Sequence, residues 1–197
     1  MAPQHFKPIF GEPAAAPPPD HSAAGQLILG AGLSLVLLLG MVALDRSLKT
    51  PAATVGIISF ELAGSKAAAA EILASWDETA RIKAGISLGL DFFFLAAYAF
   101  TLAGASHKVA GYLPRHFRHL RALGGLAAGG AWLGGALDAV ENLALIQLLT
   151  GNDKAWLPAL AAWCAWPKFG LAACALIYIG AGGILVGMQR AGRWKQF

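Results

Sequence analysis

Charged residues are scarce in this sequence. Asp, Glu, Lys and Arg make up 13% of its 197 residues, whereas an average soluble domain is about 25% charged. Hydrophobic residues make up 57%, and the mean hydropathy is +0.58, so the balance lies well outside the range of soluble globular proteins. Because this length allows about one compact unit, the composition predicts a single integral membrane domain.

Cysteine and histidine are few, and the sequence lacks several familiar motifs. Ten residues of helix would separate Cys164 from Cys174 by about 15 Å, far beyond the reach of a disulfide. No histidine lies in an apolar stretch, so paired histidines are not expected to hold a transmembrane haem. Phosphate loops, dinucleotide fingerprints, nucleophile elbows and zinc-binding helix pairs are also missing. We therefore expect no cofactor, no metal and no catalytic residue.

Four apolar stretches are long enough to cross a bilayer, which takes about 20 mainly apolar residues. They run over residues 25–44, 84–105, 123–149 and 156–188. The first carries no charge, whereas each of the others contains at least one ionisable residue. The sequence thus predicts an all-α integral membrane protein, a four-helix transmembrane bundle over residues 26–189.

The ends of the chain and the loop after the second span carry many of its basic residues. Residues 1–25 are rich in Pro and Ala, which predicts a flexible tail, and residues 190–197 form a basic C-terminal tail. Arg115, Arg118 and Arg121 are expected to contact anionic lipid headgroups, with ordinary flanking of a span as the alternative. With four spans, eight Lys and Arg residues share the side of both termini, against six opposite. This bias predicts that both termini are cytoplasmic in a bacterial inner membrane. The net charge of +4 is therefore interpreted as setting the orientation of the spans, not as a surface for binding nucleic acid.

The stretch between the first two spans is too polar to cross a membrane. Thr50 and Pro51 are typical of a helix start, so a short apolar helix is expected over residues 52–63. Ser65 is expected to cap a second helix. We interpret the stretch as a surface-lying helical segment, resting on the membrane or against the bundle.

Polar residues within the spans are the main functional signal. The spacing of Asp138, Glu141 and Asn142 is i, i+3, i+4, which places all three on one face of the third span. Asp91 in the second span and Lys168 in the fourth fall at neighbouring depths. Since three acids cannot all pair with one lysine, we expect one ion pair to Lys168 and at least one acid that is protonated or linked to water.

Small residues recur at four-residue spacing and are expected to mark helix contacts. Two such pairs, Gly125 with Gly129 and Gly130 with Gly134, lie in the third span. They predict that the third span is the central helix of the bundle.

Four short stretches resemble those of an uncharacterised family of small bacterial multi-pass membrane proteins with no assigned activity. They are GIISFELAG (56–64), LGLDFFF (88–94), LDAVENL (137–143) and PKF (167–169). The resemblance covers residues 43–187 and leaves out the first tail. It implies a four-helix membrane unit in which the intramembrane polar residues matter, together with Glu61.

These observations favour a non-enzymatic role, as an accessory or assembly subunit of a larger membrane complex. The expected partners are the lipid bilayer, other integral membrane subunits and anionic lipid, but no nucleic acid. A first alternative is the transport of a small solute or of protons by the cluster of acids and Lys168. In a second, weaker alternative the protein is a lipid-modifying enzyme, with Glu61 at the membrane surface beside the buried acids. The cluster could also serve only to hold the helices together.

Overall fold

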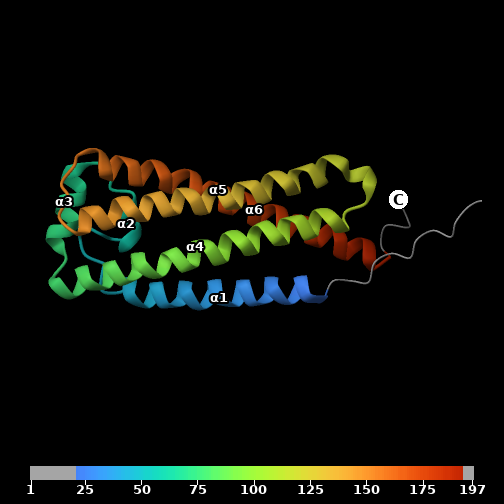
Figure 1. The fold of residues 1–197 in the computed structure, drawn as a ribbon, viewed down its shortest axis with the longest axis horizontal. Helices are drawn as coiled ribbons and strands as arrows, with labels where there is room; N and C mark the ends of the chain where they lie inside the picture. The colour runs from blue at the N-terminus through green and yellow to red at the C-terminus, as the bar shows by residue number, and fades with distance from the viewer. Residues whose placement is uncertain (1–20, 193–197) are drawn as a thin grey trace, which may run out of the picture.

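The computed structural model describes residues 21–192, and the regular elements in that range are all helices (Figure 1). They are α1 (His21–Asp45), α2 (Ile57–Glu61), α3 (Lys66–Ser75), α4 (Glu78–Tyr112), the 3₁₀ turn η1 (Arg115–Phe117), α5 (Arg118–Leu149) and α6 (Trp156–Arg190). Four of these helices, α1, α4, α5 and α6, are long and apolar enough to cross a membrane, as predicted. The two predicted tails lie mostly outside the described residues, although α1 begins within the first one.

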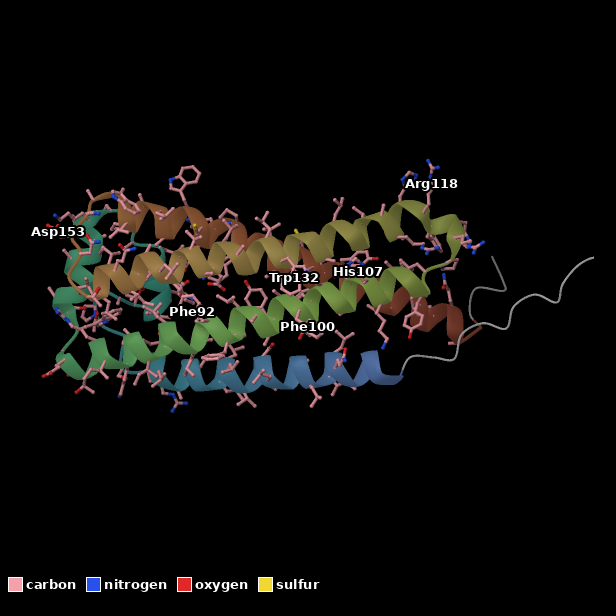
Figure 2. The ribbon with its side chains drawn as sticks, viewed as in Figure 1. Phe92, Phe100, His107, Arg118, Trp132 and Asp153 are labelled. Carbon is pink, nitrogen blue, oxygen red and sulfur yellow. The ribbon has the colours of Figure 1, made fainter. Side chains whose placement is uncertain are left out.

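The four long helices run side by side, and α2 and α3 lie across one end of the bundle (Figure 1). α4 packs against α1, α5 and α6, whereas α5 packs mainly against α4 and α6. The third span, α5, thus takes part in the two most extensive helix pairs, as expected for a central helix, while among the described helices α4 alone packs extensively against α1. Arg118 and Asp153 mark opposite ends of the bundle (Figure 2).

The glycines that bring helices together are mostly not the predicted ones. A Cβ at Gly124 would lie 2.5 Å from the Tyr178 hydroxyl, and one at Gly135 would lie 3.1 Å from the Ala99 Cβ. Gly125, one residue from Gly124 and thus about 100° around the helix, is exposed and would have no atom within 4 Å of a Cβ. The same holds for Gly129, whereas Gly130 and Gly134 do face α6.

The segment after α1 is a tight turn rather than the predicted start of a helix. Thr50 and Ala53 exchange backbone hydrogen bonds of 3.1 and 3.0 Å, which hold the chain in a turn. The helix α2 begins only at Ile57, after Gly56 with a φ of 62°. The Asp45 carboxylate accepts a 2.7 Å hydrogen bond from the Ile57 amide, so the end of α1 caps the start of α2. The predicted cap of α3 is confirmed, because the Ser65 hydroxyl accepts a hydrogen bond from the Ala68 amide at 3.2 Å.

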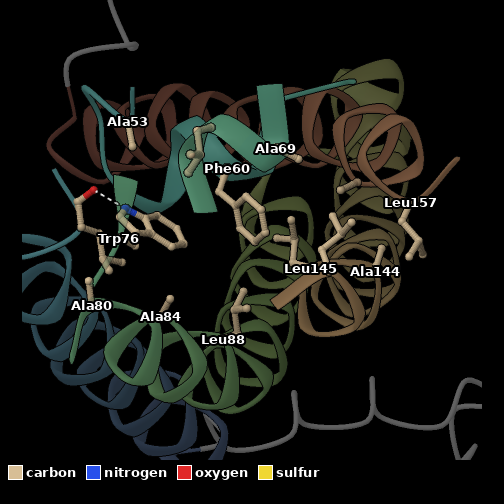
Figure 3. Packing of buried hydrophobic residues seen from close by; sticks show 14 residues of the cluster. Ala53, Phe60, Ala69, Trp76, Ala80, Ala84, Leu88, Ala144, Leu145 and Leu157 are labelled. Atoms are coloured by element: carbon tan, nitrogen blue, oxygen red, sulfur yellow. Dashed lines mark hydrogen bonds between the residues drawn. The ribbon is translucent and has the colours of Figure 1, made fainter. Parts of the chain in front are cut away.

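The main apolar core lies where α2 and α3 meet the long helices (Figure 3). Phe60 and Trp76 pack edge to face with ring centroids 5.3 Å apart. The Trp76 indole donates a 2.8 Å hydrogen bond to the Leu48 carbonyl, so its polar atom is satisfied inside the core. Leu145 of α5 and Leu157 of α6 are fully buried in the same cluster. The connecting segment is thus built into one end of the bundle, not loosely attached to it.

Candidate functional site: a buried lysine–carboxylate cluster beside an open cavity

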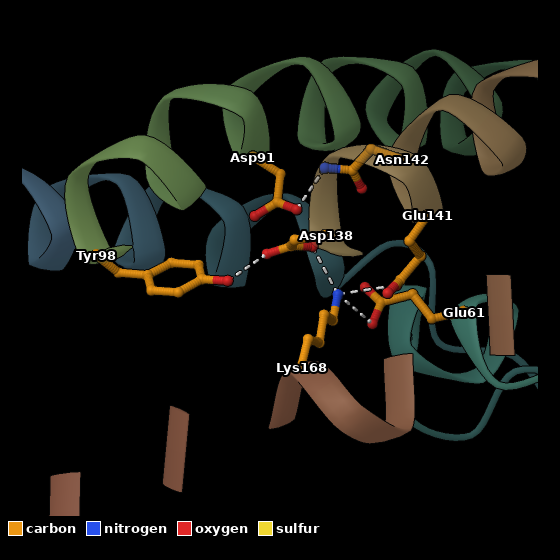
Figure 4. Close-up of polar contacts among 7 residues, drawn as sticks. All are labelled: Glu61, Asp91, Tyr98, Asp138, Glu141, Asn142 and Lys168. Atoms are coloured by element: carbon orange, nitrogen blue, oxygen red, sulfur yellow. Dashed lines mark hydrogen bonds and ion pairs between the residues drawn. The ribbon is translucent and has the colours of Figure 1, made fainter. Parts of the chain in front are cut away.

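Lys168 lies at the centre of a polar cluster formed by four helices (Figure 4). Its ammonium donates 2.8 Å hydrogen bonds to Asp138 Oδ1 and to Glu141 Oε1, both on α5. It also lies 3.4 Å from Oε2 of Glu61, on α2. The ion pair expected for Lys168 is therefore present, and the lysine contacts three carboxylates at once.

A second pair of contacts extends the cluster onto α4. The Asn142 side-chain amide donates a 2.7 Å hydrogen bond to Asp91 Oδ2. The Tyr98 hydroxyl donates a 3.2 Å hydrogen bond to Asp138 Oδ2. All five predicted cluster residues are therefore brought together, with Asp91 held by Asn142 rather than by the lysine.

Helix periodicity explains why these side chains meet. The three polar residues of α5 follow i, i+3, i+4 spacing, and Tyr98 follows Asp91 on α4 by seven residues, which is about two turns. Lys168 lies twelve residues into α6, or about 18 Å along its axis. It follows Pro167, which lies inside α6 and has no amide hydrogen to give to the carbonyl one turn earlier.

The cluster is buried and carries unequal charge. Glu141 and Asn142 are fully buried, and Asp138, Lys168 and Glu61 are no more than 8% exposed. Four carboxyl groups, including that of Asp91, surround one ammonium, so three negative charges need compensation if all of them ionise. Uncompensated charge within a membrane protein is costly. The site therefore favours binding of protons or of a positively charged group.

The atoms of the cluster that lack partners are all acceptors. Glu61 Oε2, Glu141 Oε2 and Asn142 Oδ1 are buried and accept no hydrogen bond from the described residues, although Glu61 Oε2 keeps its ion pair with Lys168. An unpaired buried acceptor costs about 1–3 kcal/mol. The cluster can therefore accept further hydrogen bonds, and its chemistry favours a donor.

A cavity of about 560 Å³ lies against the cluster. Side chains from α1, α2, α4, α5 and α6 line it, and its polar wall contains Glu61, Asp91, Asp138 and Lys168. The remainder of the lining is mainly apolar, with Leu35 of α1 as an example. This volume is within the range of about 300–1,000 Å³ typical of small-molecule sites.

Glu61 lies beside the buried acids, as the alternative of a lipid-modifying enzyme expects, and it is itself buried. Glu61 ends α2 and is 8% exposed, because the cap that Asp45 provides and the positive φ of Gly56 turn α2 into the bundle. Tyr98 and Ser87 also line the cavity, although the sequence does not single them out as site residues. The seven-residue spacing from Asp91 was a usable signal for Tyr98.

The basic loop residues form a separate region. Arg115, Arg118 and Arg121 are exposed and lie around η1 and the start of α5, and Arg118 lies at the end opposite α2 and α3 (Figure 2). Their predicted contact with anionic lipid stays a prediction. Within residues 21–192, no group of three or more His, Cys, Asp or Glu side chains is arranged to hold a metal ion, and both cysteines are free thiols.

Comparison with models of protein families, with curated proteins and with solved structures finds no match to this chain. The resemblance to small bacterial multi-pass proteins stays a prediction. Functional inference therefore depends on the cluster, the cavity and the four long apolar helices.

Proposed function

We propose that this protein is a small membrane transport protein, in which the Lys168 cluster carries protons across the membrane and binds a positively charged solute in competition with them. The observation that carries the proposal is that Lys168, in the wall of a cavity open to the outside of the bundle, contacts three carboxylates. Ionisable residues within membrane spans are rare and usually mark ion pathways or proton relays.

The competition between protons and solute follows from the charge balance. Four carboxyl groups and one ammonium favour either added protons or a cation, and each lowers the affinity of the cluster for the other. Binding of a cation at the cavity wall therefore favours proton release, and proton binding favours release of the cation. Asp91 is well placed to take part, because it lines the cavity and is only partly buried.

Proton flux into liposomes tests the proposal. The purified protein is reconstituted with the pH-sensitive dye pyranine inside, and a potassium gradient with valinomycin drives proton entry. We expect wild-type protein to carry protons, and Asp91→Asn to slow entry by about tenfold or more, which is about 1.4 kcal/mol on the barrier. The matched control is Asp153→Asn, at an exposed aspartate that does not line the cavity, which should keep the wild-type rate. Entry no faster than in empty liposomes, or an unchanged rate in Asp91→Asn, would refute the proposal.

The accessory subunit remains a second proposal, and one observation favours it. Gly125 and Gly129 are exposed on α5 with no atom within 4 Å of where a Cβ would lie, a surface that suits close contact with another membrane helix. Gentle solubilisation, a native gel and mass spectrometry of the band test it. A larger complex of fixed stoichiometry would support it, and a particle with this chain alone would exclude it.

We also propose that both termini face the cytoplasm of a bacterium, since more basic residues flank the spans on that side. Single cysteines at Ser65 and at Gly111, in a variant with Cys164 and Cys174 replaced by Ala, test this orientation. An impermeant maleimide added to intact cells should label the cysteine at Ser65 and not the one at Gly111. The reverse pattern would invert the orientation.

A further inference from the structure

We infer that the cavity binds a hydrophobic amine, a molecule with one ammonium group on an apolar body, which enters sideways between α1 and α6. The inference rests on the proposed function, because it names the class of solute for the same site. The proposed ligand is a small molecule. The amine of a membrane lipid headgroup has the same chemistry, and the test below distinguishes the two.

The rim of the cavity is apolar and open. Leu35 and Val42 of α1 line the cavity and are 57% and 51% exposed, and Leu176 of α6 lines it and is 59% exposed. Within the described residues, α1 packs extensively only against α4, so its side toward α6 is free to border the opening. Because these exposed side chains lie in helices long enough to cross a membrane, the opening faces the hydrocarbon of the bilayer. An apolar body is the part of a ligand that fits there.

The inner wall of the cavity favours a ligand with a positive charge. Lys168 has three ammonium hydrogens and three carboxylate neighbours, so an anion would find no free donor. Glu61, Asp91 and Asp138 line the same wall, so its carboxyl groups outnumber the single ammonium of Lys168. A ligand group that donates hydrogen bonds and carries positive charge matches this wall. An ammonium does both.

Binding of three probes with one chain length and different head groups tests the inference. The protein is placed in phosphatidylcholine nanodiscs, and its thermal unfolding is followed with dodecylamine, dodecanol or dodecyl sulfate. We expect dodecylamine alone to raise the Tm in a saturable way. Glu61→Gln should weaken its apparent affinity by about tenfold or more, as expected for the loss of a charged hydrogen bond. Glu71→Gln, at an exposed glutamate of α3, should bind like the wild type.

A second pair of variants does not depend on the charges. Ala172 of α6 lines the cavity, whereas its neighbour Ala173 is exposed and does not. Ala172→Trp should abolish the Tm shift by filling the cavity, and Ala173→Trp should leave it unchanged. Equal binding by the two tryptophan variants would place the site elsewhere and overturn the inference, as would equal shifts with dodecanol or a preference for dodecyl sulfate.

The source of the amine is tested by changing the lipid. Phosphatidylethanolamine at half of the nanodisc lipid should leave the dodecylamine shift unchanged if the ligand is a small molecule. Loss of the shift would instead assign the site to the lipid headgroup and overturn that part of the inference. Proton flux is measured separately, so amine binding without flux would refute only the transport proposal, and flux without amine binding would refute only the solute class.

Discussion

The end of the bundle that α2 and α3 cover is held together differently from the opposite end. At the covered end, large side chains such as Phe60, Trp76 and Leu145 fill one continuous core. In the half of the bundle away from α2 and α3, the buried apolar cluster consists of Ala103, Ala128 and Ala131. The covered end is filled by large apolar side chains that are enclosed by neighbouring residues. In the second region the buried side chains are alanines, which allow the helices to approach each other closely.

This difference is the one expected if the four long apolar helices cross a membrane, as proposed. Between helices in lipid there is little hydrophobic driving force, so close packing of small residues is favoured. Large apolar side chains contribute most where they leave water, as they do when α2 and α3 fold over the bundle end. The polar cluster includes Glu61, the last residue of α2, so the site is built partly by this covering segment. We expect the two ends to respond differently to substitution.

The largest effect is expected for Lys168→Met, which removes the cation from the cluster. Loss of one partner from a buried charge network costs about 3–5 kcal/mol, and here several carboxylates lose their partner. Thermal or denaturant unfolding in detergent measures the change. Lys66→Met is the matched control, because its ion pair with Asp153 is exposed and therefore contributes little to stability. Equal stability of the two variants would show that the buried cluster does not stabilise the covered end.

A neighbouring pair of leucines on α5 tests the core itself. Leu145 is fully buried, whereas Leu143 is 55% exposed. Leu145→Ala should lower the free energy of unfolding by about 2 kcal/mol or more, through lost burial and the cavity it leaves. Leu143→Ala should change it far less. If the two variants unfold alike, the core at the covered end is not a main source of stability.

Two adjacent glycines probe the opposite end. Gly124→Leu would force a side chain against Tyr178 and Ala110, and overpacking of this kind costs about 1–3 kcal/mol. Gly125→Leu points into open space and should leave the isolated protein unaffected. Unfolding of both variants in detergent provides the measurement. A destabilised Gly125→Leu would instead indicate that this face is already occupied, for example by a partner.

The smallest effect is expected from the exposed pair of Lys66 and Asp153. The 2.7 Å hydrogen bond from Lys66 lowers the pKa of the Asp153 carboxyl below its ordinary value. Its contribution is therefore present above the pKa of the unfolded state and is lost as the pH falls through the lower, folded-state pKa. Asp153→Asn should remove a small acid-side decline in Tm at low salt. A decline of the same size in the variant would assign it to other groups.

The sequence predicts most of the site because its residues are related by short-range periodicity. Asp138, Glu141 and Asn142 share a face through spacing alone, and hydropathy places Asp91 and Lys168 in spans. Glu61 could not be placed in this way, since its burial depends on the cap between Asp45 and Ile57, twelve residues apart. No local pattern specifies that contact.

The helix contacts were harder to predict for a related reason. The same four-residue glycine spacing fits two faces of α5, and a rotation of about 100° separates Gly124 from Gly125. Which face meets Tyr178 depends on the whole bundle, not on the spacing. The packing of α1 against α4 was not predicted either, because residues 25–44 contain no charged residue that would indicate a partner helix.

The hydrogen bond between Asp45 and Ile57 couples the end of α1 to the start of α2. Asp45 ends the helix that borders the cavity opening, and α2 is a single turn that ends at Glu61. A Cβ at Gly56 would collide with the Asp45 carboxylate, so the joint has little room to slip. Outward movement of α1 at this end must therefore either break the joint or draw Glu61 away from Lys168. As long as this hydrogen bond holds, widening of the entrance and redistribution of charge at its far wall are one motion.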